Sequence, residues 1–181
     1  GLKPRIIAPA HGLVWRGNPM VIVEKYLEWA TGKPRDRKAT VLYSSMYGLV
    51  EEAVNHVVAR LKSMNWDVRV HRATDTTRFS EADVLSDVTD SNLVVIGTAT
   101  YEAGVFPYIR YMLELITLKA NFDKPVLVIT VHGWGGVAGR EIREMLVKAG
   151  FHRIEVVEIK GKPVGEDYAR IDTALTRLIT G

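Results

Sequence analysis

Residues 39–54 read Ala-Thr-Val-Leu-Tyr-Ser-Ser-Met-Tyr-Gly-Leu-Val-Glu-Glu-Ala-Val, an apolar strand that runs directly into a helical pattern. Two serines and a glycine separate the predicted strand at residues 39–43 from the predicted helix. The first turn of such a helix has unpaired N–H groups and the positive end of the helix dipole, both of which favour a bound anion. This stretch alone is compatible with a phosphate site and with an ordinary strand–helix turn that has a serine cap.

After this turn, predicted strands and helices alternate to the end of the chain. The further strands are expected at residues 67–71, 93–97, 125–131 and 154–159, and the further helices at residues 80–90, 106–118, 137–149 and 166–179. Such alternation predicts an α/β fold in which helices cover both faces of a five-stranded parallel sheet, as a three-layer αβα sandwich. Right-handed crossovers favour the strand order 2-1-3-4-5, in which a ligand binds at the carboxyl ends of the first and third strands.

The composition is that of a compact soluble protein, because the 181 residues are 47% hydrophobic and 25% charged. The net charge of +3 is spread along the chain, which argues against a nucleic-acid partner. The absence of cysteine excludes disulfides, thiol catalysis and thiolate metal sites. No apolar run approaches the roughly 20 residues of a membrane span and no secretory signal opens the chain, so we expect a cytoplasmic protein with no membrane partner.

The first part of the chain, residues 1–36, does not follow the alternating pattern. A short apolar strand that ends in a turn is predicted at residues 6–12, followed by a helix with Asn18 as its cap and Pro19 at its first position. The polar and charged stretch at residues 31–38 predicts a solvated linker. Because this first part is too short to bury a core, we expect it to be the end of a preceding domain. The initial glycine, in place of methionine, agrees with that expectation.

Three loops of the predicted sheet have an unusual content of hydroxyl, glycine and aromatic residues, and all three lie at its carboxyl edge. Residues 44–48 follow the first strand, residues 98–104 follow the third, and residues 132–136 follow the fourth. The loops after the second and fifth strands have no comparable glycine and aromatic content. Tyr101 and Trp134 are placed to stack on a planar ring, although each alone is more often a half-buried packing residue. Because three such loops converge, we predict a ligand with a planar ring on a phosphorylated chain.

These loops also carry a family resemblance. Residues 43–52, 97–104 and 132–138, with their Ser-Met-Tyr-Gly, Thr-Tyr-Glu-Ala-Gly-Val-Phe-Pro and Gly-Trp-Gly-Gly runs, resemble the three FMN-binding loops of the flavodoxin-like domain in flavodiiron proteins, also called A-type flavoproteins. Residues 9–26, which open on Pro-Ala-His-Gly, resemble the end of the metallo-β-lactamase-like diiron domain that precedes it there. The resemblance implies a flavodoxin-like domain at residues 37–181, FMN as its cofactor, and a longer enzyme of which this chain is the carboxyl-terminal part.

Carried over position by position, the resemblance implies two groups of contacts with FMN. The phosphate would be bound by Ser44, Ser45, Met46, Tyr47, Gly48 and Leu49. The isoalloxazine ring would be bordered by Thr98, Ala99, Thr100, Tyr101, Glu102, His132, Gly133, Trp134, Gly135 and Gly136. The chain departs from the family at Val50, usually threonine, at Ala99, usually proline, and at Glu102-Ala103, usually a polar amide pair. These departures leave open weak FMN binding, and a carboxylate at Glu102 is expected to lower the flavin potential.

The resemblance further implies an electron-transfer role. Bound FMN would accept electrons from a rubredoxin-like or NADH-linked donor and pass them to a diiron site that reduces oxygen or nitric oxide. In the family that site lies on the other subunit of a head-to-tail dimer, which implies a homo-oligomer for the full-length protein. His11 falls where the family has an iron ligand, but one imidazole does not hold a diiron centre, so no metal site is predicted in this chain. No side chain looks like an acid–base catalyst, and this chain alone is not expected to reduce either gas.

Four alternatives remain open. Residues 133–138 fit the dinucleotide-binding pattern G-x-G-x-x-A, with Glu155 about twenty residues downstream, although the pattern belongs after a first strand and Trp134 is bulky there. A phosphoacceptor receiver shares the strand order but needs clustered aspartates after the first strand, where this chain has Tyr-Ser-Ser. A free-standing flavodoxin or a flavodoxin-like NAD(P)H:quinone reductase leaves residues 1–36 unexplained. A flavodoxin-fold interaction module that has lost FMN leaves the three loops unexplained.

Overall fold

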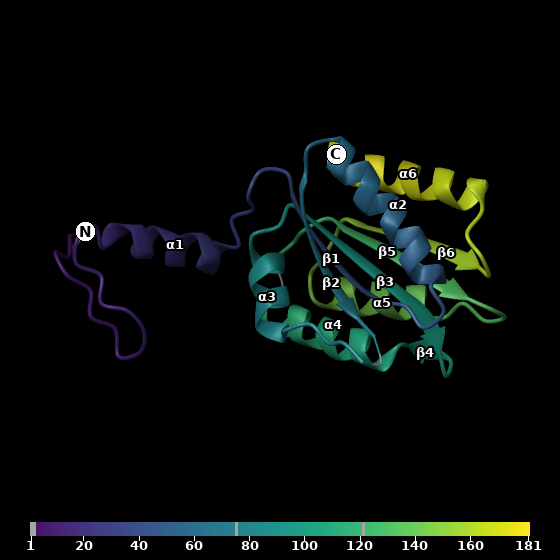
Figure 1. Ribbon diagram of the computed structural model, residues 1–181, viewed down its shortest axis with the longest axis horizontal. Coiled ribbons are helices and arrows are strands. Elements are labelled where there is room, and N and C mark those ends of the chain that lie inside the picture. The colour runs from purple at the N-terminus through teal and green to yellow at the C-terminus, as the bar shows by residue number, and fades with distance from the viewer. Residues whose placement is uncertain (1–2, 75, 121) are drawn as a thin grey trace.

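The parallel sheet that the sequence predicts forms the centre of the molecule (Figure 1). The computed structural model describes residues 3–74, 76–120 and 122–181. The five parallel strands are β1 (Lys38–Ser44), β2 (Asp67–Ala73), β3 (Leu93–Tyr101), β5 (Val126–His132) and β6 (Ile154–Lys160). They lie in the order β2-β1-β3-β5-β6, which confirms the predicted order 2-1-3-4-5 when β5 and β6 are counted as the fourth and fifth parallel strands.

Helices cover both faces of this sheet, as the three-layer prediction requires. One face is covered by α2 (Leu49–Ser63) and α6 (Gly165–Thr180), and the other by α3 (Glu81–Thr89), α4 (Pro107–Lys119) and α5 (Ala138–Lys148). Each face has its own core of buried apolar side chains, one of which includes Val41 and Leu61 and the other Leu42 and Ile109. All seven residues of β1 are buried, because helices lie on both sides of this central strand.

Local sequence signals explain where several elements begin and end. Ser80 caps α3, because its Oγ accepts a hydrogen bond from Asp83 N–H at 3.3 Å. Gly150 has a φ of +92° just after α5, the left-handed conformation that favours glycine at the end of a helix. Gly97 lets α2 pack directly on β3, because a Cβ at this position would lie 2.5 Å from Val54 Cγ2.

The sequence does not predict β4 (Gly104–Val105), a short strand that pairs antiparallel with the end of β3. The turn residues Glu102 and Ala103 have φ values of +46° and +56°, left-handed conformations for which asparagine and glycine are the usual signals. The hairpin is supported from α5, where the Glu141 carboxylate accepts a hydrogen bond from Val105 N–H at 3.0 Å. Because Glu141 lies 36 positions away in the chain, the local sequence does not reveal this turn.

The strand predicted at residues 6–12 is wrong. This stretch makes one antiparallel bridge, between Ile7 and Trp15, with N···O distances of 2.9 and 3.0 Å. In the described part of the chain no strand pairs with it, so its apolar side chains have no sheet to join. Ile6 and Leu13 beside the bridge are exposed as a result.

The helix predicted next is α1 (Met20–Thr31), which extends away from the sheet (Figure 1). Pro19 takes the cap position instead of the predicted first helical position, and Asn18 does not cap the helix. None of the α1 residues is buried by the described residues. Over residues 3–74, 76–120 and 122–181, no helix is both long enough and apolar enough to cross a membrane.

The linker predicted at residues 31–38 is only partly exposed. Thr31 and residues 33–37 are exposed, whereas Gly32 and Lys38 are buried. Lys38 Nζ pairs with Asp87 at 2.7 Å and also with Asp90. A buried ammonium group requires such partners, because its charge is costly to remove from water. The prediction of a solvated charge run is therefore wrong at Lys38, which belongs to a buried ion-pair network.

Candidate functional site

Three loops meet at the carboxyl edge of the sheet around a cavity of about 400 Å³. They follow β1, β3 and β5, the three strands after which the sequence predicts ligand-binding loops. The residues that line the cavity are Ser45, Met46, Tyr47, Leu49, Val50, Ala99, Thr100, Tyr101, Glu102, Val131, His132, Gly133, Trp134 and Gly161. A cavity of this size and largely apolar lining suits a small-molecule or cofactor ligand.

The other predicted site residues lie close by without lining this cavity: Ser44, Gly48, Thr98, Gly135 and Gly136. Ser44 lines a neighbouring cavity of about 410 Å³. Gly48 occupies the cap position of α2 with a φ of +83°, a left-handed conformation that favours glycine. Thr98 is fully buried within β3. Gly136 lies against the His132 ring, which a Cβ would approach to 2.8 Å.

The turn between β1 and α2 presents a run of free backbone donors. Glu51 N–H donates to Ser45 Oγ at 3.3 Å, and Glu52 N–H donates to Gly48 O at 2.8 Å. Within the part of the chain that the structure describes, the N–H groups of residues 46–50 donate to no protein acceptor. Five unpaired donors at the start of a helix form the kind of anion site that the sequence predicts.

Two carboxylates in the first turn of α2 would repel an anion, and both have partners. Glu51 accepts a hydrogen bond from the Tyr43 hydroxyl at 2.9 Å and pairs with Arg72 at 3.1 Å. Glu52 accepts a hydrogen bond from the Tyr168 hydroxyl at 2.9 Å. Burial, together with the Glu51 carboxylate, raises the pKa of Tyr43 to about 12, so this hydroxyl remains a donor at neutral pH. These partners offset part of the negative charge that α2 brings to the anion site.

Two aromatic rings stand at the mouth of the cavity. Trp134 is 99% exposed, so it contributes nothing to the core and a packing role is excluded. Tyr101 is 41% exposed and packs edge-on against Phe106, with 5.6 Å between the ring centroids. Phe106 thereby fixes the Tyr101 ring beside the opening. Both rings are available to a planar ligand, as the sequence predicts for this edge of the sheet.

Three buried polar side-chain atoms have no hydrogen-bond partner among the described residues, namely Thr100 Oγ1, Thr130 Oγ1 and His132 Nδ1. Thr100 and His132 line the cavity itself. Buried polar side chains are usually paired, so unpaired ones indicate a partner such as a ligand or a water molecule. Together with the free N–H run, these residues fit a cofactor that has a phosphate at one end and a hydrogen-bonding ring at the other.

The loop after the fifth parallel strand contributes Gly161 to the cavity lining, a residue that the sequence-based prediction does not assign to the site. Gly161 N–H donates to His132 O at 2.8 Å, and its φ of +74° is left-handed. The available signal is a glycine two residues after the end of the predicted strand, in the run Gly-Lys-Pro. Val131 also lines the cavity, and nothing in an apolar strand marks its last valine as a ligand contact.

The geometry contradicts the dinucleotide-binding alternative. Glu155 is the second residue of β6 and lies in register with Leu127, near the amino ends of both strands. The turn at residues 133–136 follows the carboxyl end of β5. Glu155 is therefore at the opposite edge of the sheet, where it does not reach a ligand bound at that turn.

His11 lies outside this cavity. It is exposed in the loop between Ile7 and Trp15, and it lines a separate apolar groove beside α1. The described ranges 3–74, 76–120 and 122–181 contain no group of three or more side chains able to hold a metal ion. His11 therefore has no part in the site formed by the three loops.

Comparison with known proteins agrees with this geometry. A sequence model of the flavodoxin family matches residues 41–171. The anaerobic nitric oxide reductase flavorubredoxin of Klebsiella pneumoniae is 32% identical over 162 residues, which are 90% of this chain and 33% of that protein. The nitric oxide reductase of Moorella thermoacetica is 29% identical over 175 residues, 93% of this chain and 42% of that protein.

The similarity extends to solved structures. A flavo di-iron protein from Thermotoga maritima superimposes with a TM-score of 0.88 and 37% sequence identity. The superposition covers 98% of this chain and 44% of that one. The chain thus spans about a third to two-fifths of the length of the two curated relatives.

Proposed function

This chain belongs to the flavodoxin family, and we propose that it is the FMN-binding electron-transfer module of a flavodiiron protein. The observation that carries the proposal is the run of unpaired N–H groups at residues 46–50 beside a cavity that Tyr101 and Trp134 flank. A phosphate and a flat, hydrogen-bonding ring are the two features that FMN combines. Bound FMN supplies the electron-transfer chemistry, and the protein supplies binding, orientation and local charge.

Within this proposal each part of the site has its own task. The N–H groups of residues 46–50 bind the phosphate, and the hydroxyls of Ser44 and Ser45 lie in the same turn. Thr100 and His132 line the part of the cavity in which the ring would lie. The aromatic rings at the cavity mouth stack on the ring faces and exclude water from them.

We further propose that residues 1–36 are the end of a metallo-β-lactamase-like domain and residues 37–181 the flavin domain of a longer cytoplasmic protein. The match to the Thermotoga protein, which covers 98% of this chain but 44% of that one, supports this division. Electrons would arrive from a rubredoxin-like or NADH-linked donor and leave for a diiron site on the same or a partner subunit. The names of the two curated relatives, both nitric oxide reductases, support a gas-reducing acceptor.

Titration of the purified chain with FMN, followed by removal of unbound flavin, tests the proposal. We expect one equivalent of retained FMN, with a visible absorption that dithionite bleaches. If the unaltered chain retains no flavin, the proposal fails, and an interaction module that has lost FMN becomes the better account of the fold.

Trp134→Ala should raise the Kd for FMN about 10- to 100-fold, because stacking of a flat base on an aromatic side chain is worth about 1–3 kcal/mol. The free energy of unfolding should not change, because Trp134 is 99% exposed. Trp134→Phe keeps a stacking ring and should remain within about 3-fold of the original affinity. Tyr111→Ala removes an exposed ring of α4 outside the cavity and is the matched control. Unchanged affinity in Trp134→Ala would contradict the stacking role.

Glu102→Gln should raise the midpoint potential of bound FMN by on the order of 50 mV. Glu102 lines the cavity, and its carboxylate repels the negative charge that reduction adds to the ring. Potentiometric titration at neutral pH measures the change. Glu166→Gln removes an exposed carboxylate at the start of α6, outside the cavity, and should leave the potential unchanged. A potential that does not rise in Glu102→Gln, or that rises equally in the control, contradicts the prediction.

A further inference from the structure

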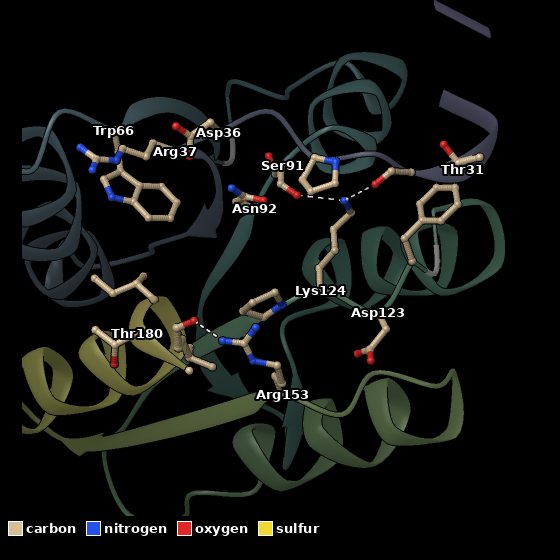
Figure 2. A pocket seen from close by; sticks show the side chains of 17 residues that line it. Thr31, Asp36, Arg37, Trp66, Ser91, Asn92, Asp123, Lys124, Arg153 and Thr180 are labelled. Atoms are coloured by element: carbon tan, nitrogen blue, oxygen red, sulfur yellow. Dashed lines mark hydrogen bonds between the residues drawn. The ribbon is translucent and has the colours of Figure 1, made fainter. Parts of the chain in front are cut away.

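A short segment, residues 32–38, connects α1 to β1, and we call it the joint. None of the α1 residues is buried by the described residues, so packing does not fix the direction of this helix. A cavity of about 710 Å³ lies beside the joint, with Gly32 and Pro34 on its lining together with Lys124 and Arg153 (Figure 2). The joint is therefore not packed against the core on this side. Whatever fixes the direction of α1 must be the individual contacts of the joint.

Lys124 contacts the first residue of the joint. Its side chain is almost fully buried, at 4% exposure, and its Nζ donates to Gly32 O at 3.0 Å and to Ser91 O at 2.9 Å (Figure 2). Gly32 is the C-cap of α1, where the carbonyl end of the helix dipole attracts a cation. Lysine is seldom buried, and desolvation lowers the pKa of Lys124 to about 8. A costly buried ammonium group thus links the end of α1 to the turn before β3.

The ring of Phe122 limits the same residue from another side. Gly32 has a φ of +59°, and a Cβ at this position would lie 2.2 Å from Phe122 Cγ. Glycine alone meets both conditions, because it adopts left-handed φ values without strain and leaves space for the ring. The end of α1 therefore has no room to move toward Phe122.

Arg35 attaches the middle of the joint to the residue that follows α3. Its N–H donates to Asp90 O at 2.7 Å, and its Nε pairs with Asp90 Oδ2 at 2.8 Å. The other carboxylate oxygen of Asp90 pairs with the buried ammonium group of Lys38, the first residue of β1. The joint is thus attached at its start to Lys124, and at its middle and its end to the same residue, Asp90.

We propose that the joint is rigid and that Lys124 is the positioning residue that sets the direction of α1 relative to the sheet. Any domain that continues from α1 is then held at one angle to the cavity at the carboxyl edge. The rigidity itself does not depend on bound FMN. Its value for electron transfer, which needs a fixed short distance between redox centres, rests on the function proposed above.

The absence of cysteine from the chain makes a direct test possible, because two introduced cysteines take spin labels at chosen positions only. Glu24→Cys on α1 and Lys148→Cys on α5 place exposed labels on either side of the joint. Double electron–electron resonance then measures the distribution of distances between the labels. We expect one narrow distribution in the labelled chain that is otherwise unaltered. In Lys124→Met the width should at least double, because the end of α1 loses its link to the turn before β3.

Two further variants make the outcome decisive. Lys119→Met removes an exposed lysine at the end of α4 and should leave the distribution unchanged. Gly32→Ala should shift the mean distance, because its Cβ forces the end of α1 away from Phe122. Thermal unfolding and FMN titration of each variant separate a loose joint from a lost fold or a lost cofactor site. A broad distribution in the unaltered chain overturns the proposal, and so do narrow, unshifted distributions in both Lys124→Met and Gly32→Ala.

Discussion

Met46→Glu should raise the Kd for FMN by at least about 100-fold. Met46 is 42% exposed and lies in the turn whose N–H groups are unpaired, so a carboxylate at this position lies next to the proposed phosphate site. Two negative charges about 5 Å apart near a protein surface repel each other by about 3 kcal/mol, which corresponds to roughly a 100-fold change in affinity. The new carboxylate also competes directly for the free N–H groups. The free energy of unfolding should change little, because the side chain is at the surface.

The matched control for this change is Met46→Gln, which has the shape of glutamate without its charge. Its affinity for FMN should stay within about 3-fold of that of the unaltered chain, as measured by quenching of flavin fluorescence. Riboflavin has the ring but no phosphate, so Met46→Glu should leave its affinity nearly unchanged. Equal losses for FMN and riboflavin would mean that the turn is distorted. An unchanged FMN affinity would place the phosphate elsewhere.

Gly97→Ala should lower the free energy of unfolding by about 3 kcal/mol. A Cβ at this position would lie 2.5 Å from Val54 Cγ2 and 2.9 Å from Tyr43 Cβ, where α2 packs on β3 beside β1. Such overpacking of a dense core forces the helix away from the strand. For a domain of this size the loss corresponds to a fall in Tm of about 6–12 °C. The affinity for FMN should fall as well, because α2 begins at the proposed phosphate turn.

Gly135→Ala is the matched control for the glycine, since no atom lies within 4 Å of a Cβ at that position. It should change the free energy of unfolding by less than about 0.5 kcal/mol. Val54→Ala in the Gly97→Ala background removes the methyl groups that clash and should recover part of the lost stability, a non-additive result expected of residues in contact. Urea and thermal unfolding measure both. If Gly97→Ala is as stable as the unaltered chain, α2 and β3 do not pack as described.

The parts of this molecule that the sequence predicts are those whose signals are local. The apolar run of β1, the serines and glycine of the turn, and the helical stripe of α2 follow one another directly along the chain. The parallel strand order then follows from alternation and crossover handedness. The three loops of the site are predictable for the same reason, because the carboxyl ends of neighbouring parallel strands necessarily meet at one edge.

The parts that the sequence does not predict depend on contacts between distant residues. The turn at Glu102-Ala103 uses left-handed residues without a glycine and is supported by Glu141. Gly161 reaches the cavity through a hydrogen bond to the His132 carbonyl, which no local pattern encodes. Thr98 belongs to a loop of the predicted site, yet β3 continues through it and buries its side chain. Sequence spacing therefore identifies the loops, and the path of the backbone decides which side chains face the cavity.

The two helices that cover one face of the sheet come from distant parts of the chain, and this separation has a consequence for biosynthesis. One face is covered by α2 and α6, and more than 100 residues separate these two helices in the chain. Translation completes every cavity-lining residue by Gly161 but does not reach the end of α6 until Thr180. Until α6 packs on this face, the new chain exposes apolar side chains of β5 and β6 that α6 later buries, and exposed surface of this kind promotes aggregation. Synthesis thus completes the cavity loops and the whole sheet before it completes the helix that covers β5 and β6 on this face.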